Sequence, residues 1–330
     1  MSMATLIRPI NVGLWVVLLL TLFVFSVSEV MAQEITREKV GAGDYGDFVV
    51  GPGKVELPLN PGESRTVEMT VTNRLGEPRV FNIEVEDAAG SNDLSRPIVL
   101  LGDDVGPYTL KDYINFPETS FVLEAGERAR IPVTIALPED VEPGGRYGSV
   151  LVTTTSVPND NRLSSEARPS SAIVTRIGTL FFITTPGEVE VEGVLEEFTT
   201  IPDKKFFTKG PINFAAIFRN DGSVHLNPYG TISVTNMLGE EVGFVELDPW
   251  YAMPQSLRYR EVAWDREFLF GRYTATLEVN RGYNDIVDSK TLSFWVIPIK
   301  LIIPAVGGLV ILLLLLRFIV TRFEFKRKES

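Results

Sequence analysis

Cysteine is absent from this 330-residue chain, which excludes both a disulfide framework and a cysteine nucleophile. Histidine occurs once, as His225, and no Gly-x-Ser-x-Gly motif is present. Zinc sites need cysteines or several histidines, and serine hydrolases need a histidine beside an activated serine. The sequence therefore predicts no catalytic site, no metal site and no cofactor.

Basic residues are the minority charge, because 31 lysines and arginines stand against 43 acidic residues, for a formal net charge of −12. This surplus of acid opposes binding to nucleic acid. Asp103 and Asp104 lie in a polar loop and leave calcium binding there as an open possibility, although no Asp-x-Asp-x-Asp-Gly loop is present. Paired carboxylates can hydrolyse glycans, but acids this abundant make the pattern uninformative, so an envelope hydrolase is the weakest alternative.

Long apolar runs occur only near the two ends of the chain. The first is preceded by Arg8 and followed by Val30-Met31-Ala32, a combination typical of a signal peptide, predicted over residues 1–32. The absence of cysteine and of Asn-x-Ser/Thr sequons favours a bacterial envelope as the destination.

The second apolar run predicts a transmembrane helix over residues 298–320. Basic residues cluster after it, so the tail over 321–330 is expected in the cytoplasm. We therefore expect a single-pass protein of the cell membrane with its N-terminal domains exported.

Strand patterns dominate the region between the two runs. In 67–71 and 131–137, apolar and polar residues alternate, which is typical of half-buried strands. Each of these segments follows a glycine turn, Leu59-Asn60-Pro61-Gly62-Glu63 in one case and Leu123-Glu124-Ala125-Gly126-Glu127 in the other. This echo predicts that the two strands lie side by side in one sheet.

A second echo, Gly-Arg-Tyr, places Tyr147 and Tyr273 at the start of two strands. A tyrosine in this position of an immunoglobulin-like sandwich can bend its hydroxyl back to the chain upstream, forming a tyrosine corner. Asn73 and Asn220 also echo each other, since each closes a strand and precedes a glycine turn. The fold class predicted is all-β, with two tandem immunoglobulin-like antiparallel β-sandwiches over 33–186 and 187–297.

Candidate ligand- or partner-binding residues lie in polar loops and on loop aromatics. Loops carry most binding sites of sandwiches, and loop aromatics can stack on sugars or anchor a partner. Trp250 can equally plug the end of its own sandwich. The candidates are Tyr108, Tyr113, Asn159, Asp160, Asn161, Arg162, Trp250 and Tyr251.

Several turn and strand motifs resemble a known family. The segments 115–117, 121–127, 131–138 and 143–148 resemble the first domain of WxL-interacting surface proteins of Gram-positive bacteria, and 214–232 resembles the second. The resemblance implies a peptidoglycan-binding first domain and a partner-binding second domain. It carries over no individual binding residue, because the matching positions are structural.

Three functions follow from these patterns. The main hypothesis is a membrane-anchored envelope protein that binds cell-wall polymer, peptidoglycan, or another surface protein, as in adhesion. The alternative is a membrane-tethered assembly factor, similar to pilus chaperones, that acts by strand addition. A long unpaired edge strand in the first domain would favour the alternative, whereas charged or covered edges would favour simple binding.

Overall fold

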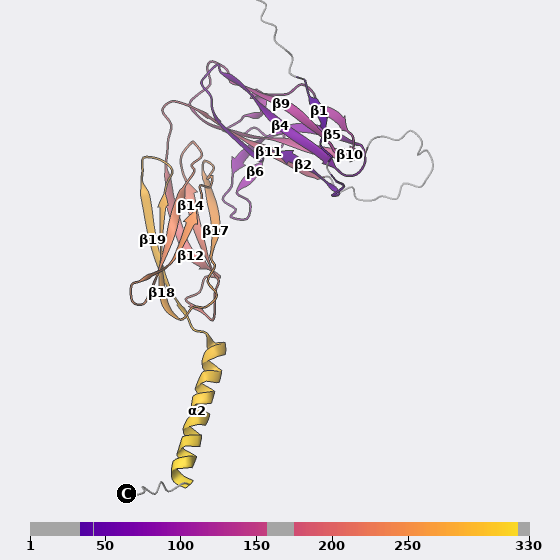
Figure 1. The fold of residues 1–330 in the computed structure, drawn as a ribbon. Helices are drawn as coiled ribbons and strands as arrows, with labels where there is room; N and C mark the ends of the chain where they lie inside the picture. The colour runs from indigo at the N-terminus through magenta and orange to yellow at the C-terminus, as the bar shows by residue number, and fades with distance from the viewer. Residues whose placement is uncertain (1–33, 42, 157–174, 323–330) are drawn as a thin grey trace, which may run out of the picture.

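A computed structural model describes residues 34–41, 43–156 and 175–322 of the chain. Its two β-sandwiches are set at an angle to each other, and an apolar helix continues from the second one (Figure 1). The predicted signal peptide and cytoplasmic tail lie outside the described residues, apart from Thr321 and Arg322 at the end of the helix.

The first sandwich consists of two packed sheets. One sheet has the strand order β1-β9-β4-β2 with β7 beside β9, and the other has the order β3-β11-β10-β5-β6 with β8 beside β5. The strands are β1 (Thr36–Lys39), β2 (Asp47–Gly51), β3 (Lys54–Pro58), β4 (Ser64–Arg74), β5 (Arg79–Gly90), β6 (Ile98–Leu100), β7 (Ile114–Asn115), β8 (Ser120–Leu123), β9 (Glu127–Ala136), β10 (Gly144–Ser156) and β11 (Arg176–Thr185), with the 3-10 helix η1 (Lys111–Tyr113) before β7.

The two similar glycine turns precede adjacent strands, as predicted. Strands β4 and β9 pair antiparallel, with Met69 opposite Ile131. Gly62 and Gly126 have φ of 76° and 73°, a conformation that favours glycine. In each turn the glutamate carboxylate accepts the amide three residues upstream, from Asn60 to Glu63 and from Glu124 to Glu127. The repeated Gly-Glu pair therefore specifies one turn geometry twice.

The core of the first sandwich lies between its two sheets. Alternate residues of β9 (Ala129, Ile131, Val133 and Ile135) are fully buried there and face aromatic side chains such as Phe81 and Phe181 of the other sheet. This burial follows directly from the period-two pattern of the sequence.

The second sandwich also has two sheets, one with the order β12-β14-β17 and one with the order β13-β19-β18-β15-β16. Its core gathers Phe214, Phe218, Trp264 and Phe294. The strands are β12 (Gly193–Ile201), β13 (Phe206–Phe207), β14 (Ile212–Asn220), β15 (Tyr229–Asn236), β16 (Glu241–Leu247), β17 (Ser256–Trp264), β18 (Gly271–Asn280) and β19 (Val287–Val296).

Two residues separate the end of β19 from the start of helix α2 (Ile299–Arg322). Its segment 299–319 is long and apolar enough to cross a membrane, with a mean hydropathy of 2.7 and no part of the span buried against the rest of the protein. The fold class predicted from the sequence, two tandem immunoglobulin-like sandwiches followed by one apolar helix, is confirmed.

Candidate functional site

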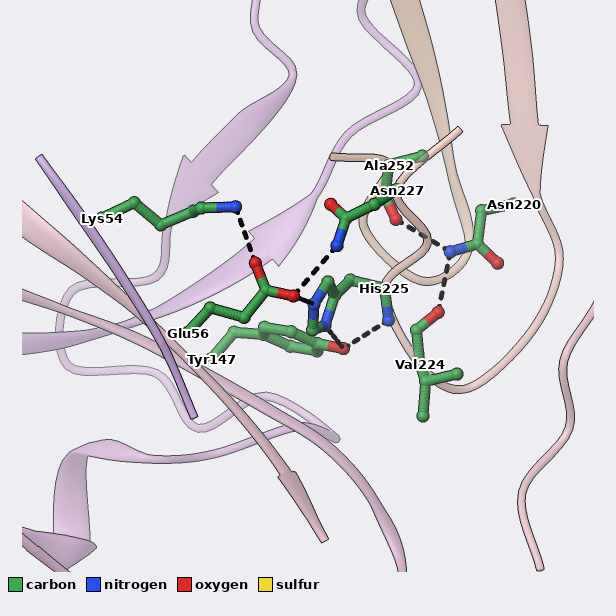
Figure 2. A network of polar contacts seen from close by, with 8 residues as sticks. All are labelled: Lys54, Glu56, Tyr147, Asn220, Val224, His225, Asn227 and Ala252. Atoms are coloured by element: carbon green, nitrogen blue, oxygen red, sulfur yellow. Dashed lines mark hydrogen bonds and ion pairs between the residues drawn. The ribbon is translucent and has the colours of Figure 1, made fainter. Parts of the chain in front are cut away.

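The two sandwiches meet in a polar network built around the single histidine. His225 lies on the loop between β14 and β15, and its side chain is 5% exposed. Its Nε2 is 2.8 Å from Oε1 of Glu56 on β3 of the first domain, and Asn227 Nδ2 donates to the same oxygen at 2.9 Å. Lys54 Nζ donates to the other carboxylate oxygen at 2.8 Å (Figure 2).

Tyr147 completes the network from β10. Its hydroxyl accepts the backbone N–H of His225 at 2.6 Å and lies 3.2 Å from His225 Nδ1 (Figure 2). The tyrosine ring is fully buried, and burial raises the pKa of its hydroxyl. The expected tyrosine corner at Tyr147 is therefore wrong, because the hydroxyl crosses to the second domain and does not return to its own chain.

The protonation state of the network follows from its contacts. Burial lowers the pKa of His225, although Glu56 opposes this effect, so the imidazole is neutral at pH 7. A carboxylate can only accept, which assigns the remaining proton to Nε2 and leaves Nδ1 to accept from the Tyr147 hydroxyl. Burial raises the pKa of Glu56, but hydrogen bonds from His225, Lys54 and Asn227 outweigh it and hold the pKa at about 2.

An aromatic cluster flanks the network at the same junction. Phe182 of β11 packs edge-on against Tyr147 and against Tyr251 of the second domain. Tyr108 packs edge-on against Tyr147, and Met253 is buried in the same cluster. Two predicted binding residues, Tyr108 and Tyr251, are thus brought together at the domain junction.

The backbones also approach closely at the junction. A Cβ added at Gly90 would lie 2.5 Å from Cβ of Ser256, so only glycine allows this approach. One residue further, Leu257 N–H at the start of β17 donates to the Ser91 carbonyl at 3.2 Å. Polar, aromatic and backbone contacts together oppose movement of one domain against the other.

The remaining predicted residues lie elsewhere. Trp250 is 4% exposed in the second core, where it offers little surface to a ligand. Tyr113 packs against the first core, with the Arg146 guanidinium over its ring. Asn159, Asp160, Asn161 and Arg162 lie outside the described residues. Binding by any of these candidates stays a prediction.

Sequence reasoning missed Glu56, Lys54 and Asn227 as parts of one network. Glu56 and His225 are 169 residues apart, and no motif joins them. Only their placement on facing ends of two sandwiches creates the site. Both ring nitrogens of His225 are engaged, one by a carboxylate and one by a tyrosine hydroxyl. At Asp103 and Asp104, where the sequence left calcium binding as an open possibility, the backbone carbonyls accept from Lys111 Nζ.

The two sides of the second sandwich differ in how their strand edges are covered. On the side of β12 and β19, side chains take up backbone groups: Asp288 accepts the Leu195 N–H at 2.8 Å, and Lys290 donates to the Glu196 carbonyl at 2.7 Å. Tyr283 hydroxyl accepts the Gly193 N–H. These contacts cover the beginning of β12.

On the opposite side, β17 is an outer strand of nine residues that pairs with β14 alone. Leu257 N–H points away from β14, so by the alternation of an antiparallel ladder the amides of Tyr259, Glu261 and Ala263 point outward as well. In the part of the chain that the structure describes, these three outward amides have no hydrogen-bond partner. Figure 1 shows β17 on the side of the second domain that faces the angle between the two domains.

The outer strands β1, β2, β3 and β6 of the first sandwich are short, with three to five residues each. The outer strand β1 has the sequence Thr-Arg-Glu-Lys, and β3, which covers 180–184 of β11, carries Lys54 and Glu56. Edge strands this short offer few backbone groups to a partner strand. The long unpaired edge that would mark a strand-adding protein is thus found in the second domain and not in the first.

Fold and junction define a protein of two immunoglobulin-like domains held at a fixed angle, with an apolar helix at the C-terminal side. No protein-family model and no curated protein matches the chain. Among solved structures it is similar to the class 5 fimbriae chaperone CfaA, with 13% identity and a TM-score of 0.35 over 76% of this chain and 100% of that one.

Two further structures show the same degree of similarity. The E. coli chaperone DraB has 14% identity and a TM-score of 0.33, with 76% of this chain and 96% of that chain covered. A structure of the Salmonella enterica SafA pilin in complex with the SafB chaperone has 13% identity and a TM-score of 0.33, with 74% and 96% covered. At these identities the likeness concerns the fold alone, and the resemblance to WxL-interacting surface proteins stays a prediction.

Proposed function

We propose that this protein is a membrane-anchored, non-enzymatic envelope protein that holds another exported protein by accepting one of its strands on the edge of β17. The observation that carries the proposal is the row of open amides on β17, a strand that the first domain already contacts at its beginning. Tyr259, Glu261 and Ala263 of this strand have outward amides with no hydrogen-bond partner among the described residues. An open edge of this length is a template for a partner strand.

The first domain already uses the beginning of this edge. Ser91 accepts the Leu257 N–H and so takes the position that the first residue of an added strand would take. A partner strand would continue from Tyr259 toward Ala263, within the angle between the domains. The Glu56–His225–Tyr147 network supports this function by keeping the angle constant, which lowers the entropic cost of binding.

A protein partner fits the site better than a wall polymer does. Sugar binding needs exposed aromatic platforms. Of the aromatic residues predicted for this role, Trp250 is buried, and Tyr108 and Tyr251 are engaged at the domain junction. Peptidoglycan binding is therefore the second candidate, and it depends on the residues 159–162 outside the described part. Helix α2 supports anchoring, because its apolar length matches a bilayer core.

A photo-crosslinking amino acid at Tyr259, introduced in the native host, tests the strand edge. We expect adducts with one exported protein, abolished by Glu261→Pro, because proline removes the outward amide without breaking the ladder to β14. Glu261→Ala is the matched control, since it removes the same carboxylate, and the hydrogen bond from Asn213 that it accepts, but keeps the amide.

The outcomes separate the candidates. Loss of the adduct in the proline variant and retention in the alanine variant supports strand addition. Equal adducts in both variants place the contact on side chains and contradict it. Absence of any adduct, together with sedimentation of the protein with purified peptidoglycan, favours the wall-binding alternative.

A further inference from the structure

The end of the second domain nearest the helix has an unusual surface. This helix-proximal end comprises the segments 202–211, 237–240, 265–272 and 295–300. Sheet register brings them together, since the paired residues at this end are Ile201 with Asn213, Ile212 with Trp264, Asn236 with Tyr273, and Gly271 with Val296.

Large apolar side chains project from each of these segments. Single exposed apolar residues are ordinary on protein surfaces, but a group of them from separate loops at one end marks a contact surface. The residues and their exposed fractions are Phe206 64%, Met237 57%, Leu238 78%, Phe268 66%, Phe270 61% and Trp295 42%.

The charge of the helix-proximal end also differs from that of the whole protein. Its segments hold six basic and four acidic residues, whereas the chain as a whole has a net charge of −12. Lys204, Lys205 and Arg272 line one cavity of about 610 Å³ together with Phe206 and Trp295. None of these three cations forms an ion pair within the described residues.

A second cavity lies where these loops meet the start of the helix. It has a volume of about 380 Å³ and lies between Lys209, Phe268 and the first turn of α2, where Lys300 contributes to its lining. Only Ile297 and Pro298 separate β19 from α2, so the domain cannot move more than a few ångströms away from the helix start.

We propose that the helix-proximal end is a membrane-contact surface that lies in the headgroup layer, with its aromatic and apolar side chains inserted and its cationic cavity facing anionic headgroups. The inference depends on the proposed membrane span of α2. Aromatic and lysine side chains are the residues that favour this interfacial layer. The contact would hold the second domain, and with it the edge of β17, at a fixed height above the bilayer.

Because the chain has no cysteine, single-cysteine variants of the full chain allow a direct test. Phe206→Cys and Phe268→Cys are labelled with a fluorophore and reconstituted in liposomes that carry nitroxide on their lipid headgroups. Val287→Cys is the matched control, since Val287 is 55% exposed at the far end of β19, nine residues or roughly 30 Å from Val296. Leu313→Cys, with nitroxide on the acyl chains, reports on the span itself.

We expect headgroup nitroxide to quench the labels at 206 and 268 at least threefold more than the label at 287. The difference should be larger in liposomes with anionic lipid than in zwitterionic ones, and Lys204→Glu with Lys205→Glu should remove that increment. Quenching at 313 without preferential quenching at 206 and 268 overturns the inference but leaves the anchor intact. No quenching at 313 overturns the membrane span, and the inference with it.

Discussion

Tyr147 and His225 belong to different domains, 78 residues apart, and share two contacts across the junction: the His225 amide donates to the tyrosine hydroxyl at 2.6 Å, and that hydroxyl lies 3.2 Å from Nδ1. The equivalent tyrosine of the second domain, Tyr273, accepts the Phe270 N–H and donates to the Phe270 carbonyl. The tyrosine of the Gly-Arg-Tyr motif therefore contacts the other domain in the first sandwich, whereas in the second sandwich it forms a local tyrosine corner.

Tyr147→Phe should destabilise the junction by about 1 to 3 kcal/mol, because the buried His225 amide loses its acceptor. Hydrogen exchange of the His225 amide, followed by mass spectrometry, should accelerate in the variant. Tyr113→Phe is the control, since the Tyr113 hydroxyl has no hydrogen-bond partner among the described residues. Unchanged exchange at His225 would show that the hydroxyl contact does not hold the domains together.

Tyr273→Phe should lower the stability of the second domain alone, by about 1 to 3 kcal/mol, because the corner to Phe270 is lost. Calorimetry should show a shifted transition for the second domain and an unshifted one for the first. Tyr229→Phe, at a 45% exposed position, serves as the control. A shift of both transitions would mean that the two domains unfold as one unit.

Acidification should weaken the junction in two stages. The pKa of His225 is lowered by burial, so the folded state binds fewer protons than the unfolded state, and stability falls as the pH drops below about 6.5. The pKa of Glu56 is about 2 against an ordinary 4.5, so its contribution is present above pH 4.5 and is lost as the pH falls toward 2.

Thermal unfolding between pH 8 and pH 2 measures both stages. Since His225 is the only histidine, a decrease in the unfolding temperature between pH 7 and pH 5.5 is assigned to it, and His225→Gln should remove that decrease. An unfolding temperature that rises over this interval would mean that the histidine is stabilised in its charged form, against the present assignment.

Asn220→Asp should cost about 3 kcal/mol or more, because the fully buried Asn220 donates from Nδ2 to the carbonyls of Val224 and Ala252, and a carboxylate cannot donate. Asn73→Asp should cost a similar amount in the first domain, where Nδ2 donates to the Leu123 carbonyl. Chemical denaturation measures both variants.

Asn280→Asp is the matched control for these asparagines, because within the described residues its side chain uses only Oδ1, as an acceptor of the Gly282 N–H. It should change stability by less than about 1 kcal/mol. Equal costs at 220 and 280 would contradict the donor role of the buried asparagines.

Local pattern determined the two sandwiches. The contacts within one sheet or one turn follow from local sequence, because strand periodicity and turn chemistry specify them. Examples are the alternation in β4 and β9, the Gly-Glu turns and the paired asparagines. The same is true of helix α2, because its length and apolarity are properties of one segment.

Tertiary structure alone decided the junction and the open edge. Glu56 and His225 meet only because the two domains pack against each other at an angle, and no period in the sequence reports such a contact. The direction of the Tyr147 hydroxyl and the missing neighbour of β17 likewise depend on what packs beside a strand, not on the strand itself. Strand residues carry the same alternating pattern at an edge as in the middle of a sheet, so the sequence determined the strands, and only their assembly determined which edge is left open for a partner.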